Sequence, residues 1–309
     1  MAFSLSAATR LLVISPHPDD ESIATGELIQ QVRQAGGDVR ILLLTNGDNN
    51  PWPQRWVERR LRIGAEERRR WGERRRGEVA RALAELGVQP ESLQALGWPD
   101  MGVTARLRED PAPTLSALRA CLEAYRPNLM AVPALGDHHP DHSAAHVLTR
   151  LALTQWQGEA PRLLAYLVHG REVDVTGRVK LDSSVELHAT KLNALANHVS
   201  QMALSGKRMR RLADRAECYQ AVSGGGRDAA FAVLPWRPPA ALLPWCHLMV
   251  ADASGVRSWR WNKAPLTRDG QGRYVLHAWA DGSPGPRFAK LHMELPSPWI
   301  FDRWGWCEL

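Results

Sequence analysis

Short apolar runs alternate with amphipathic stretches from residue 11 to about residue 201 of this 309-residue chain. The apolar runs are typical of buried strands and lie at 11–15, 39–45, 93–97, 128–134 and 162–170. The stretches with helical periodicity lie at 21–35, 113–125, 139–153 and 185–201. One more such stretch ends at Gly87. This alternation predicts an α/β fold in which a mostly parallel sheet carries helices on both faces.

The pattern changes after about residue 222, where a glycine-rich stretch begins. Beyond it, short alternating runs such as 273–280 and 289–295 replace the long helices. Eight of the 13 tryptophans lie from Trp236 onward, and we expect them to pack in a core. The sequence therefore predicts a Rossmann-like domain over residues 1–224 and a β-rich, tryptophan-rich C-terminal extension over residues 225–309.

The sequence has no run of the about 18–20 apolar residues that a membrane helix needs. The N-terminal residues lack a cleavage site and resemble a first strand rather than a signal peptide. The four cysteines are widely scattered and form no C-x-x-C pair, which favours reduced thiols over disulfides or a cysteine-based zinc site. We therefore expect a cytoplasmic protein.

The segment 55–76 holds ten arginines and four glutamates. Its glutamate–arginine spacing favours a solvated helix with ion pairs one turn apart. The alternative is a surface that binds phosphate or another anion, helped by Trp52, Trp56 and Trp71. No nucleic-acid-binding motif accompanies the arginines, so we do not expect nucleic acid as the partner. Peripheral contact with a membrane or a lipid-linked substrate through 52–76 remains open.

Two polar clusters follow apolar strands. His17, Asp19, Asp20 and Glu21 come after the first strand, and the stretch GDHHPDHSAAH (136–146) comes after the strand at 128–134. Because ligands of parallel sheets bind beyond the carboxyl ends of the strands, the two clusters can meet at one edge. Imidazole and carboxylate without thiolate suit a catalytic divalent metal, and zinc and iron are the leading candidates.

Each cluster alone also fits a simpler role. An aspartate at this position often caps the helix that follows, and a histidine at a strand end often makes only a structural hydrogen bond. His142 and His146 are four residues apart, but the glutamate of the H-E-x-x-H motif is absent. The occurrence of both clusters after buried strands favours a metal site.

The motifs P-H-P-D-D-E (16–21) and H-P-D-H (139–142) resemble the paired signature of the LmbE-like, or PIG-L, family of metal-dependent N-deacetylases. The resemblance spans roughly residues 10–222, which makes residues 1–224 an LmbE-like deacetylase domain. It also includes Gly97-Trp98-Pro99-Asp100. Members of that family remove acetyl from N-acetylglucosamine-type groups.

The resemblance also implies roles for individual residues. The metal ligands would be His17, Asp20 and His142, holding one Zn²⁺ per chain, with Fe²⁺ as an alternative. Asp19 would take a proton from the metal-activated water. The remaining implied roles are oxyanion stabilisation or protonation of the leaving amine by His139, orientation of that imidazole by Asp141, and sugar contacts by Arg75 and Asp100.

The predicted reaction is therefore zinc-dependent hydrolysis of the N-acetyl group of an amino sugar. Either Asp19 or His139 could protonate the leaving amine. The arginine-rich segment favours a phosphorylated or lipid-linked glycan precursor, met at the inner face of the membrane. The alternatives are hydrolysis of another amide or small-molecule glycoside, such as a thiol precursor or an antibiotic, and a non-catalytic protein that binds anions or glycans.

Overall fold

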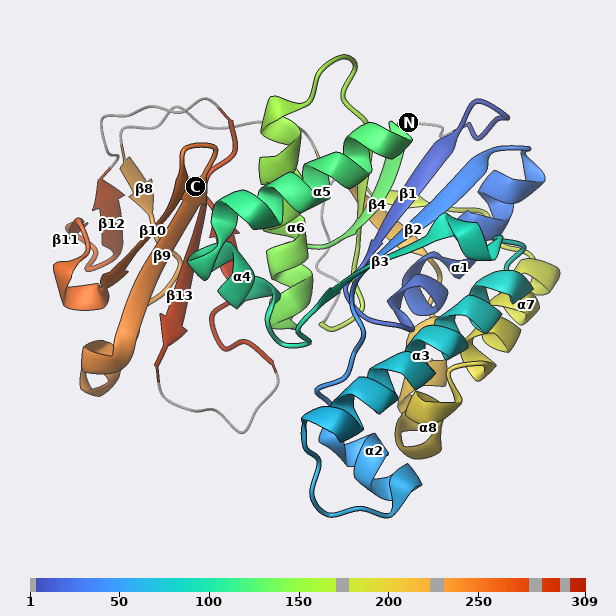
Figure 1. Cartoon of the computed structure of the whole chain (residues 1–309). Coiled ribbons are helices and arrows are strands. Elements are labelled where there is room, and N and C mark those ends of the chain that lie inside the picture. Colours follow the sequence, from blue (N-terminus) through green and yellow to red (C-terminus); the bar gives the residue numbers. More distant parts are fainter. Residues whose placement is uncertain (1–3, 171–177, 223–230, 278–284, 295–300) are drawn as a thin grey trace. The chain divides into compact units, whose positions relative to one another are not determined.

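A seven-stranded sheet in the order β3-β2-β1-β4-β5-β7-β6 organises the first part of the chain (Figure 1). Its strands are β1 Arg10–Ser15, β2 Asp38–Thr45, β3 Leu93–Trp98, β4 Leu129–Pro133, β5 Arg162–Tyr166, β6 Arg178–Lys180 and β7 Cys218–Val222. β1 to β5 pair in parallel, whereas β7 is antiparallel to both of its neighbours. The prediction of a mostly parallel sheet is therefore confirmed.

The structure is a computed structural model that describes residues 4–170, 178–222, 231–277, 285–294 and 301–309. The chain divides into two units. The first comprises 1–103, 124–134 and 159–222, and the second comprises 104–123, 135–158 and 223–309. The predicted domain boundary at residues 224/225 lies outside the described residues.

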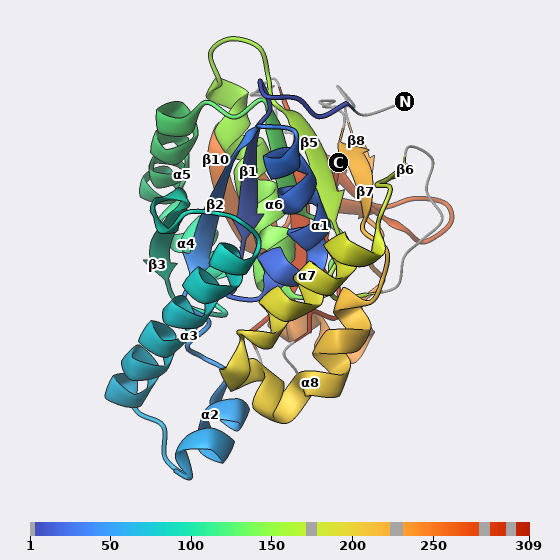
Figure 2. The same ribbon diagram turned by 90° about the vertical axis from the view of Figure 1, so that its right-hand side faces the viewer.

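Helices of the first unit cover its sheet and bury one apolar core (Figures 1 and 2). They are α1 Asp20–Gln34, α3 Ala65–Glu85, α7 Val185–Ala196 and α8 Val199–Ala213. The short helix α2 Pro51–Glu58 packs on α8 instead and adds no residue to this core. Leu11 and Ile41 from the sheet pack with Leu28 and Leu195 from the helices, and all four are fully buried. Each such side chain stabilises the fold by about 1.5–3 kcal/mol.

The predicted helix at 185–201 is in fact two helices, α7 and α8. The break falls at His198, whose backbone leaves the helical region (φ −80°, ψ 55°). Its imidazole lies 3.0 Å from a Glu21 carboxylate oxygen. A long-range contact therefore occurs at the break between the two helices. The local periodicity of the sequence did not reveal this break.

The arginine-rich segment forms α2, a loop and α3 rather than one helix. On α3, Arg69 pairs with Glu66 and Glu73, at 2.6 and 2.5 Å. This confirms the predicted solvated helix with ion pairs one turn apart. In α3, Glu67 also caps the helix by accepting a hydrogen bond from the Gly64 amide.

The second unit combines helices with two small antiparallel sheets. The helices are α4 Val103–Glu109, α5 Pro111–Tyr125 and α6 Pro140–Ala152. The sheets are β10-β9-β13-β14 and β11-β12-β8, formed by β8 Phe231–Val233, β9 Cys246–Asp252, β10 Gly255–Arg260, β11 Leu266–Arg268, β12 Tyr274–His277, β13 Phe288–Met293 and β14 Trp306–Glu308.

The C-terminal sheets share an apolar core that includes Trp236, Leu248 and Trp261. This confirms the β-rich C-terminal region. Trp236, Trp261 and Trp306 are buried as predicted, whereas Trp245 is 43% exposed. Arg150 of α6 donates a 2.8 Å hydrogen bond to Glu308 of β14, which ties that helix to the same unit. Among the described residues, no helix is both long and apolar enough to cross a bilayer.

Candidate functional site

The loop after β1 is anchored to the end of the neighbouring strand β2. The backbone amide and the hydroxyl of Thr45 both donate to the carbonyl oxygen of Pro16, at 3.0 and 2.9 Å. The Ser15 hydroxyl donates to the His17 carbonyl oxygen at 2.8 Å. His17 therefore lies in a loop whose backbone is held by the end of β1 and by the neighbouring strand β2.

His17 lies between two buried carboxylates. Its Nδ1 is 3.3 Å from Asp20 Oδ2, and its Nε2 is 3.2 Å from Asp100 Oδ1. Burial raises the pKa of Asp100, but the hydrogen bond and charge of His17 outweigh it and lower the pKa to about 2. Asp100, predicted as a sugar contact, is thus a direct partner of a predicted metal ligand.

Asp19 has an unusual backbone conformation, with φ 122° and ψ −26°. Such a conformation is strained for a residue with a side chain and persists only where its surroundings hold it. The Asp19 amide donates to Glu21 Oε2 at 3.0 Å, and Arg75 Nη2 donates to Asp19 Oδ2 at 3.0 Å. Burial raises the pKa of Asp19 to about 6, although Arg75 acts to lower it.

Arg75 reaches this loop from α3 and is 4% exposed. Its two terminal nitrogens donate to the carbonyl oxygens of Gly47 and Pro18, each at 2.6 Å. Gly47 makes the approach possible, because a Cβ at that position would lie 1.8 Å from Arg75 Nη1. Arg75, predicted as a sugar contact, therefore holds the backbone and side chain of the loop that carries Asp19.

A fully buried ion pair supports the loop from beneath. Glu21 Oε1 lies 3.0 Å from His198 Nε2, and the Ser22 hydroxyl donates to the same oxygen at 2.7 Å. Burial raises the pKa of Glu21, but His198 outweighs it and lowers that pKa. Burial acts to lower the pKa of His198, but the charge of Glu21 outweighs this effect and raises that pKa. Each partner therefore favours the ionised form of the other, and the second oxygen of Glu21 accepts from the Asp19 amide.

The second polar cluster lies at the start of α6. Asp137 Oδ1 accepts from the His139 amide at 2.9 Å, and Asp137 Oδ2 lies 3.2 Å from His142 Nδ1. A carboxylate on Nδ1 leaves the Nε2 of His142 as the nitrogen that could bind a metal. Asp137 and His142 are both buried.

The imidazole of His139 accepts a hydrogen bond through Nδ1 from the backbone amide of Asp141, at 3.2 Å. With Nδ1 as acceptor, the ring proton is on Nε2, so the neutral imidazole can donate from that atom. This contact comes from the backbone of Asp141, so the predicted orientation of His139 by the Asp141 side chain stays a prediction.

Sequence reasoning missed Asp137 and His198. Asp137 had a usable signal, because a carboxylate a few residues from a ligand histidine often orients that imidazole. No sequence signal pointed to His198, because it is 177 residues from Glu21 and no motif surrounds it.

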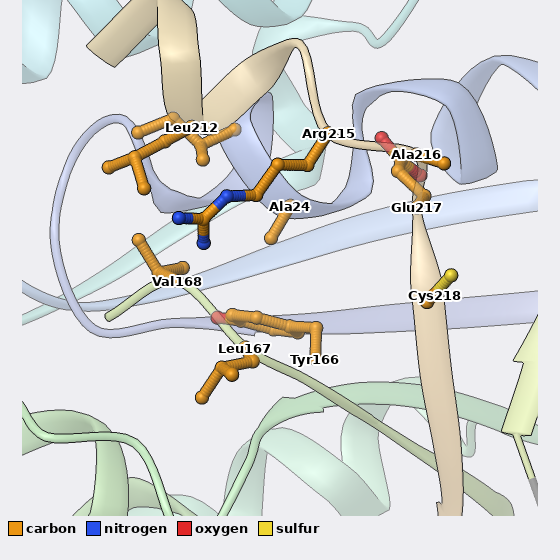
Figure 3. A pocket seen from close by; sticks show the side chains of 10 residues that line it. Ala24, Tyr166, Leu167, Val168, Leu212, Arg215, Ala216, Glu217 and Cys218 are labelled. Carbon is orange, nitrogen blue, oxygen red and sulfur yellow. The ribbon is translucent and has the colours of Figure 1, made fainter. Parts of the chain in front are cut away.

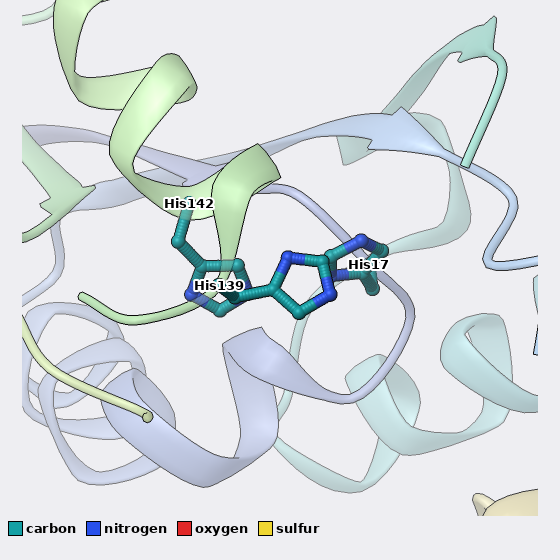
Figure 4. Close-up of side chains that lie close together, drawn as sticks. All are labelled: His17, His139 and His142. Atoms are coloured by element: carbon teal, nitrogen blue, oxygen red, sulfur yellow. The ribbon is translucent and has the colours of Figure 1, made fainter. Parts of the chain in front are cut away.

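The two clusters supply imidazoles and carboxylates, the ligand types that fit a catalytic zinc site. His139 and His142, drawn in Figure 4, lie at the start of α6 with their ring centroids 5.0 Å apart and offer two imidazoles that could bind a metal ion. The described part of the chain therefore fits a divalent metal, while the three-residue ligand set stays a prediction.

A small cavity between α1 and the segment before β7 is a separate feature (Figure 3). Its lining includes Ala24, Tyr166, Arg215 and Glu217. Its volume of about 20 Å³ is enough for one water molecule and far below the size of a sugar. This cavity is therefore not a substrate site.

Comparison with known proteins gives a match to one family and a set of relatives that are named as deacetylases. Residues 12–153 match the GlcNAc-PI de-N-acetylase (PIG-L) family. The 1D-myo-inositol 2-acetamido-2-deoxy-alpha-D-glucopyranoside deacetylase of Mycolicibacterium vanbaalenii is 33% identical over 171 residues, covering 50% of this chain and 57% of the relative. The chain thus spans little more than half the length of that relative.

Two solved structures share the fold. A deacetylase triple mutant of the teicoplanin biosynthetic pathway has a TM-score of 0.53 and 22% identity, over 69% of this chain and 98% of that chain. The 4-carboxy-2-hydroxymuconate hydratase of Pseudomonas putida KT2440 has a TM-score of 0.50 and 19% identity, over 72% of this chain and 99% of that chain. Because a deacetylase and a hydratase both have it, the fold alone does not specify the reaction.

The family match starts within β1 and ends just after α6, so it includes both polar clusters. The P-H-P-D-D-E and H-P-D-H motifs that suggested the resemblance lie inside it. Residues 12–153 of this chain are therefore similar to the PIG-L, or LmbE-like, family over the segment that carries both motifs.

Proposed function

We propose that the protein is a zinc-dependent N-deacetylase that removes acetyl from an N-acetylglucosamine-type amino sugar. The observation that carries the proposal is the Asp19 side chain, which is 14% exposed and is held in a strained backbone conformation by Arg75 and Glu21. A general base needs this kind of fixed position beside the reacting atoms. The PIG-L match and the name of the Mycolicibacterium relative support the choice of an amide in an amino sugar as substrate.

The residues that would hold zinc are His17, Asp20 and His142, with Asp137 fixing the imidazole of His142. When bound, zinc supplies Lewis acidity: it polarises a carbonyl oxygen and lowers the pKa of water from 15.7 to about 7.

Sheet topology supports the convergence of the two clusters. β1 and β4 are neighbouring parallel strands, with Leu11 opposite Leu129 and Val13 opposite Ala131. The segments that follow them therefore leave the sheet at the same edge. The Ala134 amide still donates to the Tyr166 carbonyl oxygen of β5, at 2.6 Å. Asp137 is only three residues further along the chain.

Asp19 would accept the proton of the attacking water. Arg75 holds one of its carboxylate oxygens, which leaves the other oxygen to take the proton. His139, with its proton on Nε2, would donate a hydrogen bond to the oxyanion that forms on the acetyl carbon. The amine needs a proton to leave. We assign this either to Asp19, which returns the proton it took from water, or to His139 in its doubly protonated form, in which case Asp19 passes its proton to His139 afterwards and both groups are regenerated.

For the substrate we propose a phosphorylated or lipid-linked glycan precursor. Arginine binds phosphate groups by paired hydrogen bonds, and the segment 52–76 is rich in this residue. We also propose a cytoplasmic location, at the inner face of the membrane. All four cysteines are free thiols, as expected of a reducing compartment. Arg75 and Asp100 are proposed to contact the sugar beside Asp19 and His17.

The proposal is tested by measuring acetate release from a panel of N-acetyl sugars that are free, phosphorylated or lipid-linked. Zinc-loaded protein should deacetylate at least one of them, and His142→Ala should lose both zinc and activity. Fully zinc-loaded, folded protein that releases no acetate from any member would contradict the proposed reaction. Undiminished zinc in His142→Ala would instead remove that residue from the ligand set.

A further inference from the structure

The surface around α2 exposes three large apolar side chains. Trp52 is 63% exposed, Trp56 is 67% exposed, and Leu61 in the following loop is 88% exposed. Trp52 and Trp56 are four residues apart on one helix, so their indole rings share one face. Side chains of this size are normally packed in a core, and their clustering at the surface indicates a binding function.

Arginines accompany these apolar side chains. Arg55 lies with its guanidinium 5.0 Å from the centre of the Trp52 ring. A hollow of about 600 Å³ is lined by Arg55, Trp56, Val57, Arg59, Arg60, Leu61 and Ala203. Ala203 belongs to α8, which packs beside α2 and exposes Leu204 next to it in sequence. We call Trp52, Arg55, Trp56, Arg59, Arg60, Leu61 and Arg62 the α2 surface.

The charge of the α2 surface is only partly neutralised. Arg60 pairs with Glu67 at 2.9 Å. No carboxylate in the described parts of the chain pairs with Arg59 or Arg62. On α3, by contrast, Arg69 is paired twice with glutamate. The α2 surface therefore carries positive charge that a partner can neutralise, directly beside exposed indole rings.

We propose that the α2 surface docks on an anionic lipid bilayer. Tryptophan favours the boundary between headgroups and acyl chains, and an aliphatic side chain such as Leu61 fits the same boundary. Arg59 and Arg62 carry the positive charge that attracts the phosphates of anionic headgroups. A nucleic acid would use the arginines but would leave Leu61, the most exposed of the three apolar side chains, in water. The inference concerns binding alone and holds whatever reaction the enzyme catalyses.

The structure gives a quantitative expectation. Each arginine close to an anionic membrane contributes about 1 kcal/mol, which is about a fivefold factor in the partition coefficient. Removing two of them should weaken binding about 25-fold. This contribution should fall with added salt, because the Debye length shortens from about 10 Å at 0.1 M to about 3 Å at 1 M. The contribution of the indole rings should remain.

The test is co-sedimentation of the full chain with vesicles of phosphatidylglycerol and phosphatidylcholine, or of phosphatidylcholine alone. Arg59→Asn with Arg62→Gln should lower the partition coefficient on anionic vesicles about 25-fold at low salt. Asparagine is chosen because Arg59 has a positive φ of 52°, which asparagine tolerates. Trp52→Ala with Trp56→Ala should lower binding at low and at high salt.

Two matched controls separate the α2 surface from general properties of the chain. Arg81→Gln with Lys180→Gln removes the same two charges from exposed positions on α3 and β6, and should change binding less than twofold. Trp245→Ala removes an indole that is 43% exposed elsewhere, and should leave binding unchanged. Circular dichroism should show that all variants keep the fold, because every substituted side chain is at the surface.

The proposal is overturned if the wild-type chain does not bind anionic vesicles. It is also overturned if Arg81→Gln with Lys180→Gln weakens binding as much as the α2 substitutions do, since net charge alone would then explain it. Tight binding to duplex DNA without binding to vesicles would assign the α2 surface to nucleic acid instead.

Discussion

Asp19→Asn isolates the proton-transfer role proposed for the residue. Asparagine has the same shape as aspartate, its side-chain oxygen can still accept from Arg75 Nη2, and it tolerates a positive φ better than most residues. Its backbone amide can still donate to Glu21. The substitution therefore keeps these hydrogen bonds, and it removes the negative charge of residue 19 together with its ability to accept a proton. Loss of a positioned general base lowers the rate about 10²–10⁴-fold, or about 2.7–5.5 kcal/mol in activation free energy.

The assay is acetate release at saturating substrate, together with the zinc content of each variant. Asp19→Asn should keep one zinc per chain and a nearly unchanged KM, with the loss confined to kcat. Asp20→Asn provides the comparison, because it alters a predicted ligand: it should lose zinc and activity together and recover part of both in excess zinc. A kcat for Asp19→Asn within a few-fold of the wild-type value would refute the assignment of Asp19 as the base.

Three further substitutions test other contacts. Asp137→Ala should weaken zinc binding about 10–100-fold, measured by competition with a chromophoric chelator, because the imidazole next to it loses its orienting carboxylate; unchanged affinity would contradict this. Gly47→Ala should lower kcat while the protein stays folded, since its Cβ would lie 1.8 Å from Arg75 Nη1; wild-type kinetics would show that the arginine position is unimportant. Lys191→Met should lower the free energy of unfolding by about 3 kcal/mol in urea titrations, because it leaves the buried carboxylate of Glu217 without its 2.9 Å ammonium partner; a loss below about 1 kcal/mol would contradict the ionised pair.

The sequence predicts those parts of the molecule whose cause is local. The run 11–15 holds four consecutive apolar residues followed by a serine, and its short length between polar stretches favours a buried strand. His17 and Asp20 can be identified from the sequence because both are possible metal ligands and they lie three residues apart directly after a strand. The partners of these residues were not predictable in the same way. Arg75 was identified only by family resemblance, and its contact with Asp19 depends on how α3 packs beside the β1 loop.

His198 shows the limit most clearly. Periodicity over 185–201 predicts one helix, because the residues on each side of the break are all compatible with helix. The break is defined by the backbone of His198, and its imidazole meets Glu21 from far along the chain. Only tertiary structure brings these two residues together, so no window of sequence contains the information.

The Glu21–His198 contact has a consequence for how the chain can be cut and how it is made. The family match ends at residue 153, yet the core of the first unit also needs β5, β7, α7 and α8, which lie between residues 162 and 222. A fragment that stops at 153 would keep every motif residue and still lack the imidazole that pairs with the buried Glu21 carboxylate. On the ribosome, Glu21 is synthesised 177 residues before His198, so their contact can form only after that later segment has been made. The segment that carries the family signature therefore holds only part of the core of the first unit.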